Sequence, residues 1–210
     1  MNKLHFNFAI VAFATSFLFS SCSKDETVAP EKPLVAQTVS NLAADATVNP
    51  TTGQPQAPTG KFTLFSFATN SVVANTDSAT TKWDIGFRGT TIIVNGGAVR
   101  KGQGGAYIFT GLFDELKEIS ATQTFATDET TTTLAITTGS GKGWYNYDAA
   151  NNWISPIAGK VLVIKTGEGK FAKVEILSYY KDAPSVVSAT AVARYFTFRY
   201  VYQANGSKKF

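Results

Sequence analysis

The chain has 210 residues, of which 44% are hydrophobic and 16% are charged, and this is the composition of a globular protein. Its formal net charge of +4 is modest, and no run of lysines or arginines stands out. Nucleic acids and acidic membrane surfaces are bound through clustered basic residues, so we exclude a nucleic-acid-binding protein.

Residues 1–21 are predicted to be a lipoprotein signal peptide. Lys3 precedes an apolar stretch of signal-peptide length, which is too short to span a bilayer comfortably. Small residues then lead to Cys22, the only cysteine of the chain. This arrangement resembles a bacterial lipoprotein signal, in which the cysteine is acylated and becomes the new N-terminus; a free thiol near an ordinary cleavage site is the alternative. Each buried methylene adds about 0.8 kcal/mol of membrane affinity, so an acylated Cys22 would anchor the protein.

Residues 22–60 are predicted to be the lipidated N-terminus and a tether. The first of them, Ser23-Lys24-Asp25-Glu26, resemble an export tag that sends lipoproteins to the outer face of the outer membrane, although a solvated start of the tether would look the same. Prolines interrupt this segment too often for a regular helix or a central strand. We expect at most one short edge strand within it, at residues 34–39.

Residues 61–205 are predicted to form one all-β, antiparallel domain, built as a single sheet or a sandwich. Apolar and polar residues alternate in short runs separated by Gly, Asn or Asp, which is typical of strands. In chain order the runs are "KWDIGFR" (82–88), "TTIIV" (90–94), "GGAYIFTG" (104–111), "TTTLAIT" (131–137), "KVLVIK" (160–165), "KFAKVEILSYY" (170–180) and "VARYFTFRYVYQ" (192–203). The run at 113–119 could make one or two helical turns at most.

Few residues could support catalysis. The only histidine is His5 and the only methionine is Met1, and both precede the predicted cleavage site. The mature chain therefore lacks the imidazole that a catalytic triad or a histidine-ligated metal requires. Two carboxylates could still hydrolyse a glycoside, but no spacing singles out a pair. We predict that the protein is not an enzyme.

The stretch "RKGQGGA" (100–106) has two interpretations. Glycine-rich loops cradle phosphates when they open a helix whose N-terminal amides meet the anion. These glycines instead separate two strand-like runs, which favours a turn or a bulge.

Four stretches, taken in order, carry a family resemblance. They are "FTLFSFATNSVV" with "TKWDIGFRGTTIIVNGG", then "GQGGAYIFTG", then "GSGKGWYNYD", and finally "KVLVIKTGEGKFAKVEILSYY" with the aromatic last strand. Together they span about residues 62–202 and resemble the HmuY family of haem-binding outer-membrane lipoproteins. The resemblance implies an all-β, non-catalytic haemophore on the cell surface. Its partners would be haem or a host haem protein and a TonB-dependent receptor.

The family's haem ligands are histidines or methionines, and this chain has neither at the matching places. One place is Asp148-Ala149 and the other is the Thr-rich stretch 121–139. Tyrosinate is another haem ligand, and Tyr145 and Tyr147 would project from one face of a strand.

The ligand site predicted from this resemblance lies in "GKGWYNYDAANNW" (141–153). Tyr145 and Tyr147 would ligate the metal, Trp144 and Trp153 would stack on the ligand, and Lys142 would meet a propionate. The alternative is that these rings pack a tight hairpin of the core.

Two functions follow from these observations. The first is capture of haem or another flat hydrophobic molecule by a surface lipoprotein. The second is an accessory or interaction lipoprotein that kept the scaffold and lost the ligands.

Overall fold

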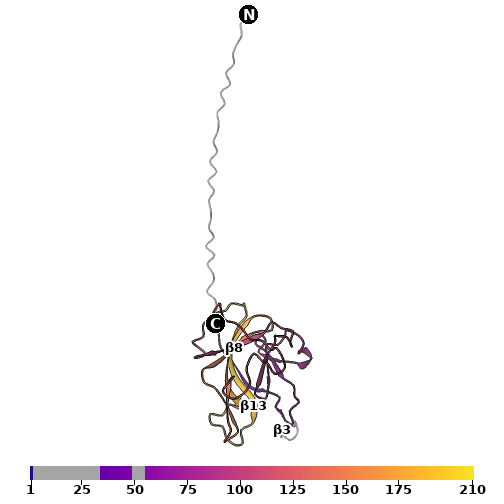
Figure 1. Ribbon diagram of the computed structural model, residues 1–210, viewed down its shortest axis with the longest axis vertical. Helices are drawn as coiled ribbons and strands as arrows, with labels where there is room; N and C mark the ends of the chain where they lie inside the picture. The colour runs from indigo at the N-terminus through magenta and orange to yellow at the C-terminus, as the bar shows by residue number, and fades with distance from the viewer. Residues whose placement is uncertain (2–33, 49–54) are drawn as a thin grey trace. The chain divides into compact units, whose positions relative to one another are not determined.

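Antiparallel pairing organises every sheet among the described residues, which are Met1, residues 34–48 and residues 55–210. Leu34–Phe210 forms a compact unit, in which β3 and the C-terminus lie at opposite ends (Figure 1). One 3-10 turn, Asn75–Asp77, interrupts the strands. The all-β prediction is thereby confirmed, whereas the predicted signal peptide, Cys22 and the export tag lie outside the described residues.

The larger sheet has five strands and contains the two longest runs of the sequence. Its order is β1 (Gln37–Ala43), β13 (Ala193–Gln203), β12 (Phe171–Tyr180), β11 (Lys160–Lys165) and β8 (Gly105–Thr110). The predicted hairpin at 160–180 is confirmed, since β11 pairs with β12 in a register that sets Leu162 opposite Val174. The aromatic run at 192–203 is the longest strand, as predicted.

A four-stranded sheet and two small hairpins complete the fold. The sheet runs β5 (Ser71–Val73), β4 (Thr63–Ser66), β6 (Ile85–Arg88) and β7 (Thr91–Val94). The hairpins pair β2 (Thr47–Val48) with β3 (Pro55–Gln56), and β9 (Tyr145–Asp148) with β10 (Trp153–Pro156).

The main core lies between the faces of the two larger sheets. Phe87 of the four-stranded sheet packs against Phe196 and Phe198 of β13, with ring centroids 4.8 and 5.5 Å apart. Phe65 of β4 meets Phe198 edge-on at 5.5 Å. Each of these rings is buried, and aromatic pairs in such arrangements add to the stabilisation from burial alone.

The compact unit begins earlier than residue 61, where the sequence places the start of the domain. β1 pairs with β13 as the edge of the five-stranded sheet, and Leu42 and Ala44 are buried in the core. The stretch from Leu34 to Asn49 contains no proline, so its N–H groups are free to join a sheet. The edge strand expected at 34–39 therefore lies at Gln37–Ala43.

One local expectation, a strand at residues 131–137, differs from the structure. Residues 131–137 form no strand, because polar side chains take up their backbone groups: Thr130 Oγ1 accepts from the N–H of Thr133, and Asp128 Oδ1 accepts from that of Ala135. Residues 113–119 form turns without a helix, and the Lys173 ammonium binds the carbonyls of Phe113 and Leu116. None of the described residues belongs to a helix long and apolar enough to cross a membrane.

Candidate ligand-binding site

The hairpin β9–β10 contains most of the predicted site. Its register sets Trp153 opposite Asp148 and Ile154 opposite Tyr147. The Asp148 carboxylate closes the turn by accepting from the N–H of Ala150 at 2.9 Å and from Asn151 Nδ2 at 2.8 Å. Hydrogen bonds from Asn151 and Ala150 lower the pKa of Asp148, so the turn is held by an ionised carboxylate at neutral pH.

Tyr145 and Tyr147 share one face of the hairpin but differ in exposure. Tyr145 is 8% exposed, and its hydroxyl accepts from Thr90 Oγ1 at 3.5 Å. Tyr147 is 45% exposed, and its hydroxyl donates to Asn152 Oδ1 at 2.6 Å. Of the two phenols, Tyr147 is therefore the one that a ligand could reach.

Trp144, Trp153 and Lys142 occupy three different environments. Trp144 is 2% exposed, donates from Nε1 to the Thr90 carbonyl, and packs against Phe196 at 5.0 Å. Trp153 is half-buried and lies on the opposite face of the hairpin from Tyr147, because it pairs with Asp148. Lys142 is exposed before the first strand. The five predicted residues thus do not converge on one cavity, and Trp153 alone of the five lines one of the cavities described below.

Two cavities share one wall, and the smaller of them opens beside the hairpin. We name residues 188–193 ("SATAVA") the alanine-rich loop, and its Ala189, Ala191 and Ala193 line both cavities. The smaller cavity, of about 290 Å³, is completed by hairpin residues and by the end of β12: Asn151, Asn152, Trp153, Ile154, Tyr179 and Tyr180. The larger, of about 470 Å³, is completed by residues around β3 and β13: Asp45, Ala46, Gln56, Pro58, Arg194 and Tyr195. We call the two together the hairpin-end cavities.

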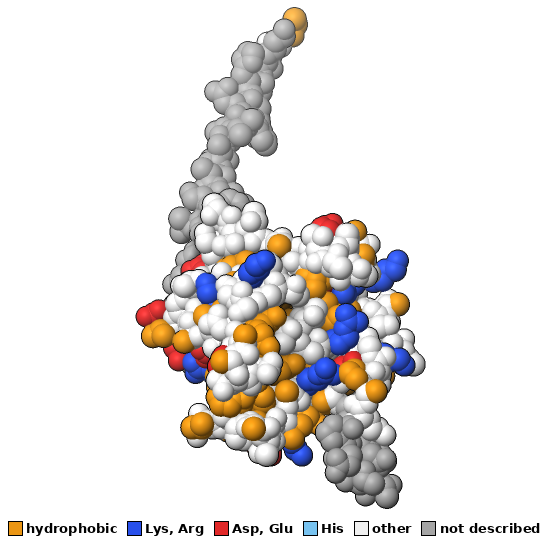
Figure 2. All heavy atoms as spheres, turned by 60° about the horizontal axis from the view of Figure 1, so that its bottom comes forward, with side chains coloured by type: hydrophobic (Ala, Val, Ile, Leu, Met, Phe, Trp, Pro, Cys, Tyr) orange, Lys and Arg blue, Asp and Glu red, His pale blue; other side chains and the backbone are white. Residues whose placement is uncertain are grey.

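Hydrophobic side chains gather on this end of the domain, which Figure 2 brings forward. The side chains of the alanine-rich loop are too small to fill the smaller cavity. Aromatic rings form its opposite wall. Tyr180 ties that wall to the hairpin, because its hydroxyl accepts from the N–H of Ile154 at 2.9 Å. The resulting space is concave, mixes aromatic and alanine side chains with polar ones such as Asn151 and Asn152, and is of the size that small ligands occupy.

Strained backbone surrounds the hairpin-end cavities. Among their lining residues, Asp45, Asn152 and Arg194 have φ values of 58°, 58° and 68°. Asp182 and Ala183, which precede the alanine-rich loop, have φ values of 61° and 44°. Arginine and alanine are not the residues that usually adopt this left-handed conformation, and such strain tends to cluster at functional sites.

Arg194 supplies a cation beside these cavities. Burial raises the pKa of Asp45, but hydrogen bonds from Thr59 and Gly60 and the charge of Arg194 lower it overall. Burial raises the pKa of Tyr179 to about 12, against the opposing charge of Arg194, so this phenol stays protonated at neutral pH. Within the described part of the chain, no group of three or more His, Cys, Asp or Glu could hold a metal ion.

The sequence pointed to the hairpin but missed the wall that faces it. The alanine-rich loop, Arg194 and Tyr195 carry no recognised motif. One signal could have found them: eleven consecutive residues (183–193), none larger than valine, directly precede Arg194 and the aromatic residues of the last strand. A stretch of small side chains facing large rings predicts space between them.

Comparison with known proteins gives one family and several solved structures. Residues 59–200 match the family model described as HmuY protein. No curated protein matches the chain.

Three solved structures match most of this chain with TM-scores below 0.5. A proposed HmuY-like haem-binding protein from Bacteroides vulgatus ATCC 8482 has 18% identity and a TM-score of 0.49, and the match covers 80% of this chain and 91% of that one. A proposed lipoprotein from Bacteroides fragilis NCTC 9343 has 16% identity and a TM-score of 0.48, with coverages of 80% and 89%. The apo HmuY analogue from Tannerella forsythia has 14% identity and a TM-score of 0.40, with coverages of 82% and 97%.

Proposed function

Because the chain belongs to the HmuY family, whose model covers well over half of its residues, we propose that it binds haem or a similar planar hydrophobic ligand. The family is one of haem-binding, non-enzymatic proteins. In this proposal Cys22 carries the lipid anchor that holds the domain at the outer membrane, exposed on the cell surface. The bound ligand is then passed to a TonB-dependent receptor.

The pair of hairpin-end cavities is the observation that carries this proposal. They share residues of the alanine-rich loop and measure about 290 and 470 Å³, and the larger lies within the size range of small-molecule sites. The half-buried Trp153 offers flat apolar surface, and burial of such surface is worth about 25 cal/mol per Å². Arg194 and the exposed Lys142 are the cations proposed to meet propionates.

Tyr147 is the proposed iron ligand of the tyrosine pair. It shares its hairpin face with Ile154, which lines the smaller cavity, whereas Tyr145 is buried against Thr90. A phenol has an unperturbed pKa near 10, so the iron itself must favour the ionised form. Release of Tyr147 from Asn152 Oδ1 would accompany ligation, because that hydrogen bond uses the phenolic proton.

A second function is supported by the burial of two predicted site residues and by the absence of the family's ligand residues. Trp144 and Tyr145 are buried in the core, and neither Asp148-Ala149 nor residues 121–139 contain a histidine or methionine. An accessory lipoprotein that retains the scaffold and binds no haem is consistent with both observations.

Haemin titration of residues 23–210 separates the two functions. Capture predicts a shifted Soret band with saturable binding, together with the charge-transfer bands of a ferric tyrosinate. Tyr147→Phe should abolish those bands, while Tyr145→Phe, the matched control two residues away, should keep them. A wild-type spectrum identical to that of free haemin would refute capture and leave the accessory function.

A further inference from the structure

A separate cavity of about 470 Å³ opens on the four-stranded sheet. Its floor is apolar and comes from β4, β7 and the segments beside them, with Phe62, Leu64, Trp83 and Ile93 as members. Trp83 is fixed there by a hydrogen bond from its Nε1 to the Ser78 carbonyl at 2.9 Å. Leu64, Trp83 and Ile93 are almost fully buried, so the floor is rigid, and the accessible apolar surface comes from Phe62 and Val99.

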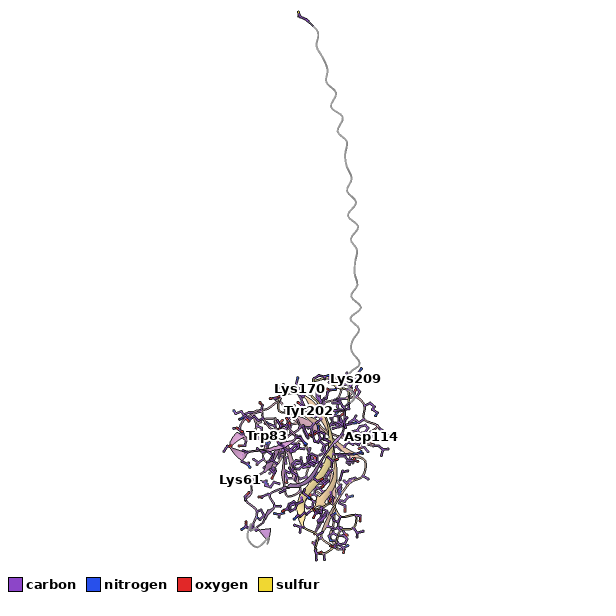
Figure 3. All side chains as sticks on the ribbon, turned by 180° about the vertical axis from the view of Figure 1, so that it is seen from behind. Lys61, Trp83, Asp114, Lys170, Tyr202 and Lys209 are labelled. Atoms are coloured by element: carbon purple, nitrogen blue, oxygen red, sulfur yellow. The ribbon has the colours of Figure 1, made fainter. Side chains whose placement is uncertain are left out.

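Basic side chains line the rim of this cavity. Lys61, Arg100 and Lys101 all contribute to it, and none of the described residues that line it is acidic. Figure 3 shows Lys61 and Trp83 on the same side of the domain. A low-dielectric floor with a single sign of charge at its edge favours a ligand of opposite charge.

The rim cations differ in how far they are already paired. Arg100 Nη1 lies 2.8 Å from Asp128 Oδ2, but this nitrogen has no aligned hydrogen-bond acceptor among the described residues. Lys61 and Lys101 are exposed and form no ion pair with any described residue. Two lysines are thus available to an incoming anion.

The glycine-rich turn explains how these residues reach the cavity. A side chain at Gly96 would place its Cβ 1.9 Å from the Gly104 carbonyl oxygen, so the two ends of the turn can approach only as glycines. Asn95 fastens the turn, since its carbonyl accepts from the N–H of Gly104 at 2.7 Å. The residues between, including Val99, Arg100 and Lys101, form one wall of the cavity. The turn therefore positions Val99, Arg100 and Lys101 at the cavity. No helix follows it, so its amides do not form a phosphate-binding loop of the helix-opening kind.

We propose that this cavity is a second ligand site, which takes a small aromatic organic anion. The ring would lie on Phe62 and Val99 above Trp83, and the carboxylate or sulfonate would lie between Lys61 and Lys101. The site is distinct from the hairpin-end cavities, with which it shares no lining residue.

Two dyes with nearly the same aromatic body test the proposal on the mature chain. The probe is 8-anilinonaphthalene-1-sulfonate, and the control is the uncharged N-phenyl-1-naphthylamine. The double variant Lys61→Gln/Lys101→Gln should weaken binding of the anionic dye about tenfold and leave the neutral dye within twofold. The matched control Lys165→Gln/Lys209→Gln removes the same charge elsewhere and should change neither.

A third variant tests the cavity without altering charge. Ala79 is an exposed lining residue, and Ala79→Phe should fill the cavity and remove the high-affinity binding of both dyes. Equal effects of the two lysine pairs, or retained binding in Ala79→Phe, would overturn the proposal.

Haemin distinguishes this site from the proposed function. Its affinity should be the same in Lys61→Gln/Lys101→Gln as in the wild type. A parallel loss of haemin affinity would mean that this cavity is the haem site itself, and the second-site proposal would then fall. Absence of haemin binding with intact dye binding would overturn only the proposed function.

Discussion

The aromatic core and the hairpin end are built from similar rings but are packed in opposite ways. In the core, Phe87, Phe196 and Phe198 interleave across two sheets and are fully buried. At the hairpin end, Trp153 and Tyr180 face a loop of small residues and border a cavity. The size of the facing side chains, and not the rings themselves, separates packing from a site.

The two regions also differ in the pKa shifts of their carboxylates and in their backbone φ values. The packed region holds Asp84, whose pKa burial raises to about 6. Hydrogen bonds lower the pKa of Asp148, at the hairpin tip, where burial opposes them only weakly. The hairpin end also carries the left-handed φ values of Ala183 and Arg194. The packed region therefore holds a carboxylate whose ionised form burial disfavours, whereas the hairpin end carries left-handed backbone and, at Asp148, a carboxylate whose ionised form hydrogen bonds favour.

The largest expected effect comes from removing a core ring. Phe198→Ala should lower the free energy of unfolding by about 3–5 kcal/mol, because the cavity left between the two sheets cannot close. Trp153→Ala should cost only about 1 kcal/mol, since the half-buried ring already borders open space. Urea unfolding followed by fluorescence measures both changes. Equal losses in the two variants would erase the distinction between the regions.

The next effect is the pH dependence of stability that Asp84 confers. Its carboxylate accepts from the N–H groups of Phe67 and Gly167, but burial still raises its pKa above the unfolded value of 3.8. The folded state thus holds the proton more tightly, so this stabilisation is present below pH 3.8 and is lost as the pH rises through about 6. The loss should be roughly 2–3 kcal/mol.

Comparison of Asp84→Asn with Asp148→Asn checks this assignment. The free energy of unfolding of the wild type should fall between pH 4 and 7, and this fall should be absent in Asp84→Asn. The fall should persist in Asp148→Asn, because hydrogen bonds lower the pKa of Asp148, whereas burial raises that of Asp84. An unchanged decline in Asp84→Asn would show that another group titrates in this window.

Much of this fold could be predicted because its strands are locally encoded. In the runs at 160–180 and 192–203, the alternation of apolar and polar residues, the length of each run and the turn residues between them all predict strands. β1 was harder to predict, because its composition resembles the tether and its pairing partner, β13, lies some 150 residues away in sequence. Residues 131–137 have strand propensity but lose their backbone hydrogen bonds to Thr130 and Asp128.

The candidate site was predictable in place but not in composition. The density of rings and turn residues at 141–153 predicted a hairpin, and β9–β10 is that hairpin. Alternation cannot tell which ring faces a core and which faces a gap, because that depends on residues distant in sequence. Trp144 is buried by Phe196 and Tyr179, whereas Trp153 meets the alanine-rich loop.

A smaller effect is expected from filling the hairpin-end cavities. Ala189 is exposed and lines both of them, so Ala189→Trp should weaken haemin binding at least tenfold, or about 1.4 kcal/mol. Its unfolding free energy should change little, since no packed neighbour is displaced. Val186→Trp adds the same ring at an exposed position two residues before the alanine-rich loop, outside the residues that line the cavities, and should bind haemin normally. Normal haemin affinity in Ala189→Trp would place the ligand elsewhere.

The smallest effect concerns the strain itself. Ala183 has a φ of 44°, which costs an alanine roughly 1–2 kcal/mol and a glycine almost nothing. Glycine gains conformational freedom in the unfolded chain, which offsets roughly 0.4–1 kcal/mol of that relief. Ala183→Gly should therefore leave stability unchanged or raise it by up to about 1.6 kcal/mol. Ala172→Gly, within β12, should lower it by about 1–2 kcal/mol, because glycine gains freedom in the unfolded chain and the buried methyl group of Ala172 is lost. Similar losses in both variants would show that the loop before the cavities carries no relievable strain.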